Sequence, residues 1–246
     1  MEVRISATDL GYRELNRAIR MAAAQGADTI FVHEVNGQYY LGAGMKGYLR
    51  LVVNGVPGND LACYLDGVEI RVIGNAQDGV GNTMSSGRVI VEGSVGDVLG
   101  YGMRGGEIFV RDNVGYRAGI HMKEFADSCP VVVIGGSAGA FLGEYMAGGR
   151  IILLGLKTGS RPLIGPYCGS GMHGGRIFIR EPVDPTCISR NVQVSVTTED
   201  DRDFLHEYFL RYCAYFGFNP DVWDELSFIK LTPQGSRPYG SLYTGV

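Results

Sequence analysis

Short hydrophobic runs of four or five residues recur along most of the chain, and most of them follow one or two glycines. The runs are rich in β-branched and aromatic residues, which is typical of strands rather than helices. The predicted strands are residues 68–72, 88–91, 107–111, 131–134, 150–154 and 176–180. We therefore predict a series of short strands with similar connections between them.

A repeat becomes visible when the chain is aligned on the residue that precedes each glycine cluster. The aligned residues are Met45, Leu65, Met84, Met103, Met122, Met146 and Met172. Their spacings are 20, 19, 19, 19, 24 and 26 residues, and the two longer spacings contain insertions at 123–128 and 157–162. A period of about 19 residues is too short for helix-pair repeats and suits one coil of a parallel β-helix. Stacking about seven coils would turn the aligned residues into an internal ladder.

Glycine is the second regular feature of the repeat. The chain has 38 glycines, about twice the average usage. They recur at the third and seventh positions before the aligned residue, and we expect these positions to form the corners of the coils because glycine reaches positive φ at low cost. The corner glycines are Gly81, Gly96, Gly100, Gly115, Gly119, Gly139, Gly143, Gly165 and Gly169. The first two units fit less well, since Arg50 falls where later units place an apolar residue, and we expect them to be irregular.

Two segments outside the repeat show helical spacing. Residues 11–25 place Leu15, Ile19 and Ala22 or Ala23 on one face and end at Gly26, so we predict a helix that caps the first coil.

The second helix is predicted to begin at Thr198 and to end before Gly217. Four aromatic residues lie four apart on one of its faces, namely Phe204, Tyr208, Tyr212 and Phe216. This face is expected to pack against the last coil or to contact a partner protein. Residues 227–246 contain two prolines and no periodicity, which predicts an irregular or extended arm.

These elements predict an all-β-dominated fold, a single-stranded parallel β-helix with flanking helices. We divide it into an N-terminal helical cap at 1–34, a β-helix of GXGXG repeats at 35–193, and an aromatic helix with an extended tail at 194–246.

Composition narrows the classes of function. The chain of 246 residues is 45% hydrophobic, 20% charged and has a net charge of −4, which predicts a globular protein and disfavours nucleic-acid binding. Its apolar runs are too short to span a membrane, and charges interrupt the first residues where a signal peptide would be apolar. We therefore expect a cytoplasmic protein that binds neither membrane nor nucleic acid.

Motifs for metal or cofactor binding lack the context that such sites need. Five cysteines are scattered without a C-x-x-C pair, so no metal site is predicted. Residues 100–105 match the G-x-G-x-x-G fingerprint of dinucleotide-binding folds, but a strand follows where a helix should begin. We predict no catalytic, cofactor-binding or metal-binding residue in this chain.

Three weaker candidates for catalysis have structural explanations. Ser137 lies in a G-x-S-x-G sequence, but repeat corner sequence follows it instead of a helix. His121 and His173 lie beside the aligned methionines on different coils, so a shared site is not indicated. Asp78, Asp97 and Asp112 come from successive coils, as carboxylates of β-helical polysaccharide-cleaving enzymes do, but their corner positions favour capping of backbone groups.

Three units of the repeat point to a known family. Residues 74–81, 100–110 and 143–151 resemble the G-x-G-x-G repeat domain at the C-terminus of the glutamate synthase large subunit, which also occurs in a subunit of formylmethanofuran dehydrogenase. The resemblance covers residues 35–181. It implies a right-handed β-helix without catalytic residues, which packs against a flavin-containing synthase domain and a glutamine amidotransferase domain.

The chain departs from the long form of that family because it has neither of these two domains. The resemblance therefore implies a separate structural or assembly subunit for glutamate biosynthesis, with FMN and iron–sulfur clusters only on partner chains. The expected partners are a glutamine amidotransferase and a flavin-containing synthase subunit.

Two other functions remain open at this point. The chain could serve a tungsten or molybdenum enzyme similar to formylmethanofuran dehydrogenase. It could also be a self-sufficient enzyme or ligand-binding protein that uses the outer groove of the solenoid. Self-association through the coil ends is open as well.

Overall fold

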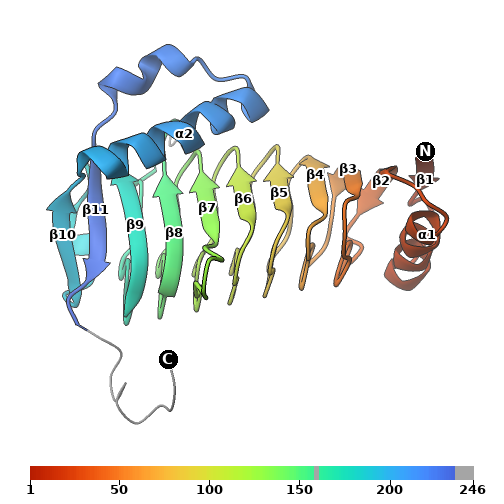
Figure 1. The fold of residues 1–246 in the computed structure, drawn as a ribbon, viewed down its shortest axis with the longest axis horizontal. Coiled ribbons are helices and arrows are strands. Elements are labelled where there is room, and N and C mark those ends of the chain that lie inside the picture. The colour runs from red at the N-terminus through yellow and green to blue at the C-terminus, as the bar shows by residue number, and fades with distance from the viewer. Residues whose placement is uncertain (158–160, 236–246) are drawn as a thin grey trace, which may run out of the picture.

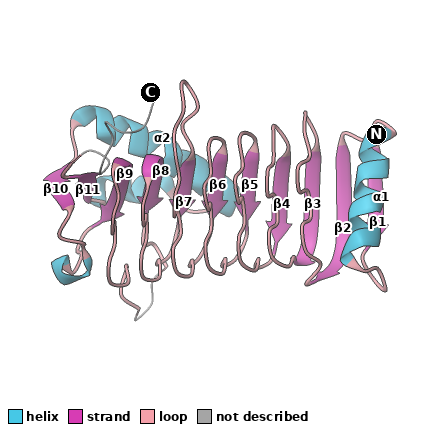
Figure 2. Ribbon diagram, turned by 90° about the horizontal axis from the view of Figure 1, so that it is seen from below, coloured by secondary structure: helices cyan, strands magenta, loops and turns pink. Residues whose placement is uncertain are grey.

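The computed structural model describes residues 1–157 and 161–235, and these residues form a parallel β-solenoid (Figure 1). Its strands join into one sheet in the order β1-β2-β3-β4-β5-β6-β7-β8-β9-β11-β10. The sheet is one side of the solenoid, and loops form the return path of each coil (Figure 2). The expected β-helical fold is confirmed.

The N-terminal region is more than a helical cap. Strand β1 (Glu2–Ser6), helix α1 (Tyr12–Ala24) and strand β2 (Thr29–Asn36) follow one another, and β1 pairs in parallel with β2. Both strands therefore extend the sheet, which corrects the assignment of 1–34 as helical alone. Helix α1 buries the expected face of Leu15, Ile19 and Ala22.

The repeat builds one strand per coil. The strands are β3 (Arg50–Val56), β4 (Glu69–Ile73), β5 (Arg88–Val91), β6 (Glu107–Val110), β7 (Val131–Ile134), β8 (Ala147–Leu153) and β9 (Gly174–Arg180). They pair in parallel and in matching register, apart from a shift between Ala147 and Arg150 where β8 pairs with β9. The solenoid has about six turns, slightly fewer than seven, and the pairing of its first unit shifts register between Val32 and Val35.

The aligned residues form the internal ladder that the repeat predicts. All seven are buried: Leu65, Met84, Met103, Met122 and Met146 are fully inaccessible, and Met45 and Met172 are nearly so. They belong to one continuous core that runs through the solenoid. A single coil cannot enclose its own apolar side chains, so this core stabilises the coils collectively.

The corner glycines fall into two groups, and each group needs glycine for a different reason. Gly81, Gly100, Gly119, Gly143 and Gly169 have positive φ, as expected. The positions four residues earlier do not, which corrects the expectation for Gly96, Gly115, Gly139 and Gly165. A Cβ at Gly115, for example, would lie 2.0 Å from Asp97 Oδ1. These positions need glycine because the neighbouring coil lies too close for a side chain.

The C-terminal region closes the sheet. Strand β10 (Val192–Val196) follows a short 3-10 helix, η1 (Pro185–Cys187), and α2 (Glu199–Phe216) leads through the 3-10 helix η2 (Pro220–Glu225) to β11 (Phe228–Pro233). Strand β11 lies between β9 and β10 and is antiparallel to both. The first part of the predicted arm is therefore a strand, while 236–246 lies outside the described residues.

Helix α2 lies along the outer face of the sheet and does not cap the last coil (Figure 1). It starts as predicted, since the Thr198 side chain accepts from the backbone N–H of Asp201 in a capping box, and Gly217 ends it with a left-handed conformation. Its apolar face packs on a second cluster that includes Phe109, Val133, Ile152 and Phe178, which come from four strands. A wide apolar strip on the sheet, rather than the end of the solenoid, thus determines where α2 binds.

Candidate functional site

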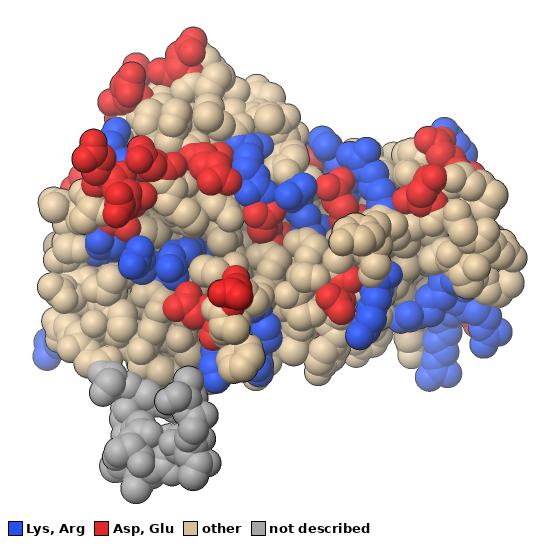
Figure 3. All heavy atoms as spheres, viewed as in Figure 1, with Lys and Arg blue, Asp and Glu red and all other residues tan. Residues whose placement is uncertain are grey.

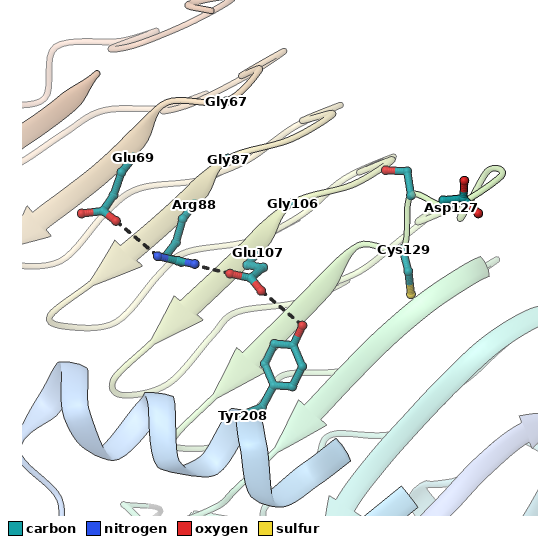
Figure 4. A pocket seen from close by; sticks show the side chains of 10 residues that line it. Gly67, Glu69, Gly87, Arg88, Gly106, Glu107, Asp127, Cys129 and Tyr208 are labelled. Atoms are coloured by element: carbon teal, nitrogen blue, oxygen red, sulfur yellow. Dashed lines mark hydrogen bonds and ion pairs between the residues drawn. The ribbon is translucent and has the colours of Figure 1, made fainter. Parts of the chain in front are cut away.

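A ladder of alternating charge runs across the outer face of the sheet. It consists of the first residues of β3 to β6, which stand next to one another in the strand register. The successive ion pairs are Arg50 to Glu69 at 3.1 Å, Glu69 to Arg88 at 3.4 Å and Arg88 to Glu107 at 2.9 Å. Figure 4 shows three of these side chains projecting from neighbouring strands toward one another. Arg50 therefore fits the repeat, and the expected irregularity at this residue is wrong.

Helix α2 ends the ladder at Glu107. The Tyr208 hydroxyl donates a hydrogen bond of 3.2 Å to Glu107, and the Arg211 guanidinium donates a second bond to the same carboxylate. Partial burial by itself raises the pKa of Glu107, but the hydrogen bonds from Arg211 and Arg88 outweigh it and hold the pKa below its usual value. Glu107 is therefore a permanently ionised anchor near neutral pH and a poor proton donor.

A polar cleft of about 470 Å³ opens beside this anchor. One wall is the charged ladder with Tyr208, and the other is Asp127, Ser128 and Cys129 of the loop before β7 (Figure 4). Partial burial raises the pKa of the Cys129 thiol, so it is protonated and a weak nucleophile near neutral pH. The cleft offers neutralised charges and no activated base or nucleophile.

Two further cysteines, Cys63 and Cys168, are buried. Burial raises the pKa of Cys63 to about 11 and that of Cys168 to about 12. Among residues 1–157 and 161–235, no three side chains of His, Cys, Asp or Glu are grouped so that they could hold a metal ion.

The histidines and the serine of the sequence motifs do not come together in one site. His121 stacks on Tyr145 with ring centroids 5.4 Å apart, whereas His173 Nδ1 lies 3.3 Å from the carbonyl oxygen of Gly171. Ser137 is buried, and its hydroxyl donates to Asn113 Oδ1 at 2.9 Å. Neither a nucleophile nor a shared histidine pair is formed.

The corner carboxylates cap backbone groups of the next coil. Asp78 Oδ1 accepts from the N–H of Asp97 at 2.8 Å, and Asp97 Oδ1 accepts from the N–H of Tyr116 at 2.8 Å. Asp112 instead forms an ion pair with Arg111. The predicted capping is confirmed for Asp78 and Asp97, and the capped groups lie one coil further along.

The aromatic residues on the predicted face of α2 pack against other parts of this chain. Tyr208 is nearly buried, and Tyr212 is fully buried with its hydroxyl donating to the Arg111 carbonyl at 2.7 Å. This corrects the expectation that Tyr212 offers a surface to a partner. Phe204 and Phe216 are only partly buried against the same cluster, so a partner contact there stays a prediction.

A second cleft lies at the N-terminal end of the solenoid. It has a volume of about 590 Å³ and runs along α1, between that helix and the first return loop. Tyr12, Ala24, Tyr40 and Ala43 supply apolar walls. Three arginines of the helix border it, Arg13, Arg17 and Arg20, and all three are exposed.

The sequence interpretation missed both clefts. The ladder had a usable signal, because Arg50, Glu69, Arg88 and Glu107 recur every 19 residues with alternating charge. The cleft along α1 had none, since Tyr40 and Ala43 lie in a loop whose distance from the helix depends on the fold.

Comparison with known proteins agrees with this architecture. The family model described as GXGXG motif matches residues 19–228. An uncharacterized protein from Methanocaldococcus jannaschii is 42% identical over 252 aligned positions, which cover 99% of this chain and 97% of that protein. Within the described ranges, no helix is long and apolar enough to cross a membrane. With a stacked-coil core formed by its glycine and methionine repeat, and a family match over most of its length, the chain belongs to the GXGXG motif family.

Proposed function

We propose that this chain is a noncatalytic structural and assembly subunit of a glutamate synthase-type complex. Partner chains would contribute the glutamine amidotransferase and the flavin-containing synthase, with FMN and iron–sulfur clusters bound there. Ammonia from glutamine would be used reductively on a 2-oxo acid by those partners. A cytoplasmic location belongs to the same proposal.

The main support for the proposal is that the residues characteristic of the family, its glycines and aligned methionines, serve to build the fold. The glycines permit tight corners and close stacking, and the aligned methionines fill the core. The charged groups at the polar cleft beside Glu107 are paired with one another, because Glu69, Arg88 and Glu107 form successive ion pairs. Such a chain is suited to holding other subunits at a fixed distance rather than to performing a reaction itself.

The test is reconstitution from separately purified subunits. Affinity purification of the native complex, followed by mass spectrometry, identifies the chains that co-elute with this protein. The purified chain alone is expected to show no glutaminase or glutamate synthase activity. Adding it to the isolated amidotransferase and synthase chains is expected to raise glutamine-dependent glutamate formation, because assembly brings the two reactions together.

Other results would contradict the proposal in recognisable ways. Co-elution with a tungsten or molybdenum enzyme would favour the alternative that this chain serves an enzyme similar to formylmethanofuran dehydrogenase. Equal glutamine-dependent activity with and without this chain would exclude an assembly function. Turnover by the chain alone would direct attention to its own clefts.

A further inference from the structure

Three exposed arginines of α1 at the N-terminal end of the solenoid, Arg13, Arg17 and Arg20, form no ion pair within the part of the chain that the structure describes. Within the described residues, none of Arg13, Arg17 and Arg20 has a carboxylate within 4.0 Å, although the whole chain has a net charge of −4. The strand arginines Arg50 and Arg88, by contrast, are both paired. Figure 3 shows a group of basic side chains at the end that carries α1, with some acidic side chains at the same end, whereas acidic side chains predominate over α2 and the 3-10 helix after it.

The same end has the apolar walls that a docking peptide needs. Tyr12, Tyr39 and Tyr40 form a cluster with ring centroids 6.0 to 6.4 Å apart, and Tyr39 and Tyr40 are each 45% exposed. On the helix side, Met21 is 55% exposed. Rigid aromatic side chains that are already packed together lose little entropy on binding, which makes them good anchors at interfaces.

The shape of the cleft fits a helix. Its lining runs from Tyr12 to Ala24 along α1, which is about 18 Å at 1.5 Å per residue, or three turns of a second helix lying alongside. Strand β1, the outermost strand of the sheet at this end, pairs with β2 alone. Within the described residues, the edge of the sheet at this end therefore has no further partner strand.

We propose that this cleft, the α1 cleft, binds an acidic amphipathic helix of a partner subunit. The apolar side chains of that helix would occupy the space between α1 and Tyr40, and its carboxylates would face Arg13 and Arg17. This inference deepens the proposed assembly function and rests on it, since it identifies where a subunit of that complex attaches.

Two other occupants fit the chemistry less well. A second copy docking through its own α1 would bring arginines against arginines. A membrane surface needs a projecting apolar row, but Tyr12 and Met21 are the only large apolar side chains exposed on α1, which is fully described, and Tyr12 lines a hollow.

Site-specific photo-crosslinking in the native complex tests the proposal. The full-length protein carries p-benzoylphenylalanine at position 21, in place of Met21, and the matched control carries it at position 196, in place of the exposed Val196 of β10. Crosslinked peptides are sequenced. Position 21 is expected to capture a partner segment with an excess of Asp and Glu and apolar residues three and four apart, and position 196 is expected not to capture it.

Charge substitution supplies an independent measurement. Arg13→Glu with Arg17→Glu is expected to weaken subunit binding by about tenfold at low salt, because rim charges govern association and its salt dependence. The charge-preserving pair Arg13→Lys with Arg17→Lys should bind nearly as well as the unchanged protein. Circular dichroism and thermal unfolding confirm that both variants fold.

The outcomes separate the two proposals. A crosslink to an acidic helix of a chain that is neither amidotransferase nor synthase keeps the α1 cleft and overturns the proposed function. Assembly with those two chains, but with equal affinity for the Glu and Lys variants, keeps the function and overturns the cleft. A crosslink from position 21 to this chain itself, to lipid or to a segment without acidic excess also overturns it.

Discussion

The carboxylate of Glu107 on β6 is bound by the guanidinium of Arg211 on α2, a residue 104 positions further along the chain. Glu107 also closes the charged ladder through Arg88. One acidic side chain thus joins the row of stacked coils to the helix that covers their outer face. Because both partners of the contact are mostly shielded from solvent, its loss should be measurable as a change in stability.

We expect Glu107→Gln to lower the free energy of unfolding by about 1–3 kcal/mol at pH 7, because Arg88 and Arg211 lose their shared counter-ion. The pKa of Glu107 is lowered in the folded state. Its contribution is therefore complete above the unfolded pKa of about 4.3 and disappears as the pH falls through the lower folded value. Urea unfolding of both proteins between pH 7 and pH 3 measures this difference.

Glu2→Gln on the exposed edge strand is the control for that experiment and should change stability by less than about 0.5 kcal/mol. A difference between wild type and Glu107→Gln that stays constant down to pH 3 would show that the pair is not the cause.

The positive-φ glycines provide a test of close packing. Gly143 has φ +69, and a Cβ there would lie 2.5 Å from Ile177 Cδ1 in the next coil. Gly143→Ala is expected to cost about 2–5 kcal/mol, from backbone strain of about 1–2 kcal/mol plus overpacking. Gly26→Ala shares the backbone penalty, at φ +88, but meets nothing within 4 Å, so it should cost only the strain. Equal losses in chemical denaturation would contradict the packing argument.

The methionine ladder predicts a graded response to side-chain volume. Met103 is fully buried, so Met103→Ala should lower the free energy of unfolding by about 2–5 kcal/mol by leaving a cavity. Met103→Leu conserves volume and should cost less than about 1.5 kcal/mol. Met21→Ala, at an exposed position, serves as the reference in thermal and urea unfolding. A tolerated Met103→Ala would mean that the ladder contributes little to the core.

The hydroxyl of Tyr212 should contribute to stability the free energy of one buried hydrogen bond. Tyr212→Phe removes the donor to the Arg111 carbonyl and is expected to cost about 1 kcal/mol, since that carbonyl then lacks a partner. The aromatic ring stays, so far-ultraviolet circular dichroism should not change. Tyr212→Ala should cost about 3–5 kcal/mol, the usual loss for a buried aromatic ring. A neutral Tyr212→Phe would show that the ring alone holds α2.

Thiol accessibility reports on the same architecture. Burial raises the pKa of Cys63 to about 11 and of Cys168 to about 12, so both are protonated and shielded at pH 8. We expect Ellman's reagent to modify the exposed Cys129 in the native protein, slowly because its pKa is also raised, and to reach Cys168 only in denaturant. Mass spectrometry of the modified peptides identifies the sites, and rapid native modification of Cys168 would contradict the buried position.

Local sequence patterns predict the solenoid correctly because each coil repeats the same arrangement of strand, corner glycines and core residue. Met84 and Met103 occupy the same position in successive coils, and each strand lies beside the copy that is 19 to 26 residues away. Pairing between neighbouring units therefore follows from periodicity alone. The caps of α2 are equally local, since Thr198 and Gly217 act within one turn of the helix ends.

Contacts between distant segments were not predictable in this way. Nothing in the local pattern shows that β11 enters between β9 and β10, because any strand with a suitable edge could pair there. The same holds for α2, whose aromatic face matches any apolar surface of sufficient width. The strip formed by Phe109, Ile152 and Phe178 exists only after their strands have stacked.

The shape of each coil follows from the amino-acid sequence, because glycine conformation, apolar core positions and strand length are properties of segments of about 19 residues. The position of α2, the burial of its tyrosines and the cleft between α1 and Tyr40 with its exposed arginines became known only from the folded chain. Those features depend on distances between segments that are far apart in the chain. Such distances are set only when the stacked coils present a complete surface, which no single repeat contains.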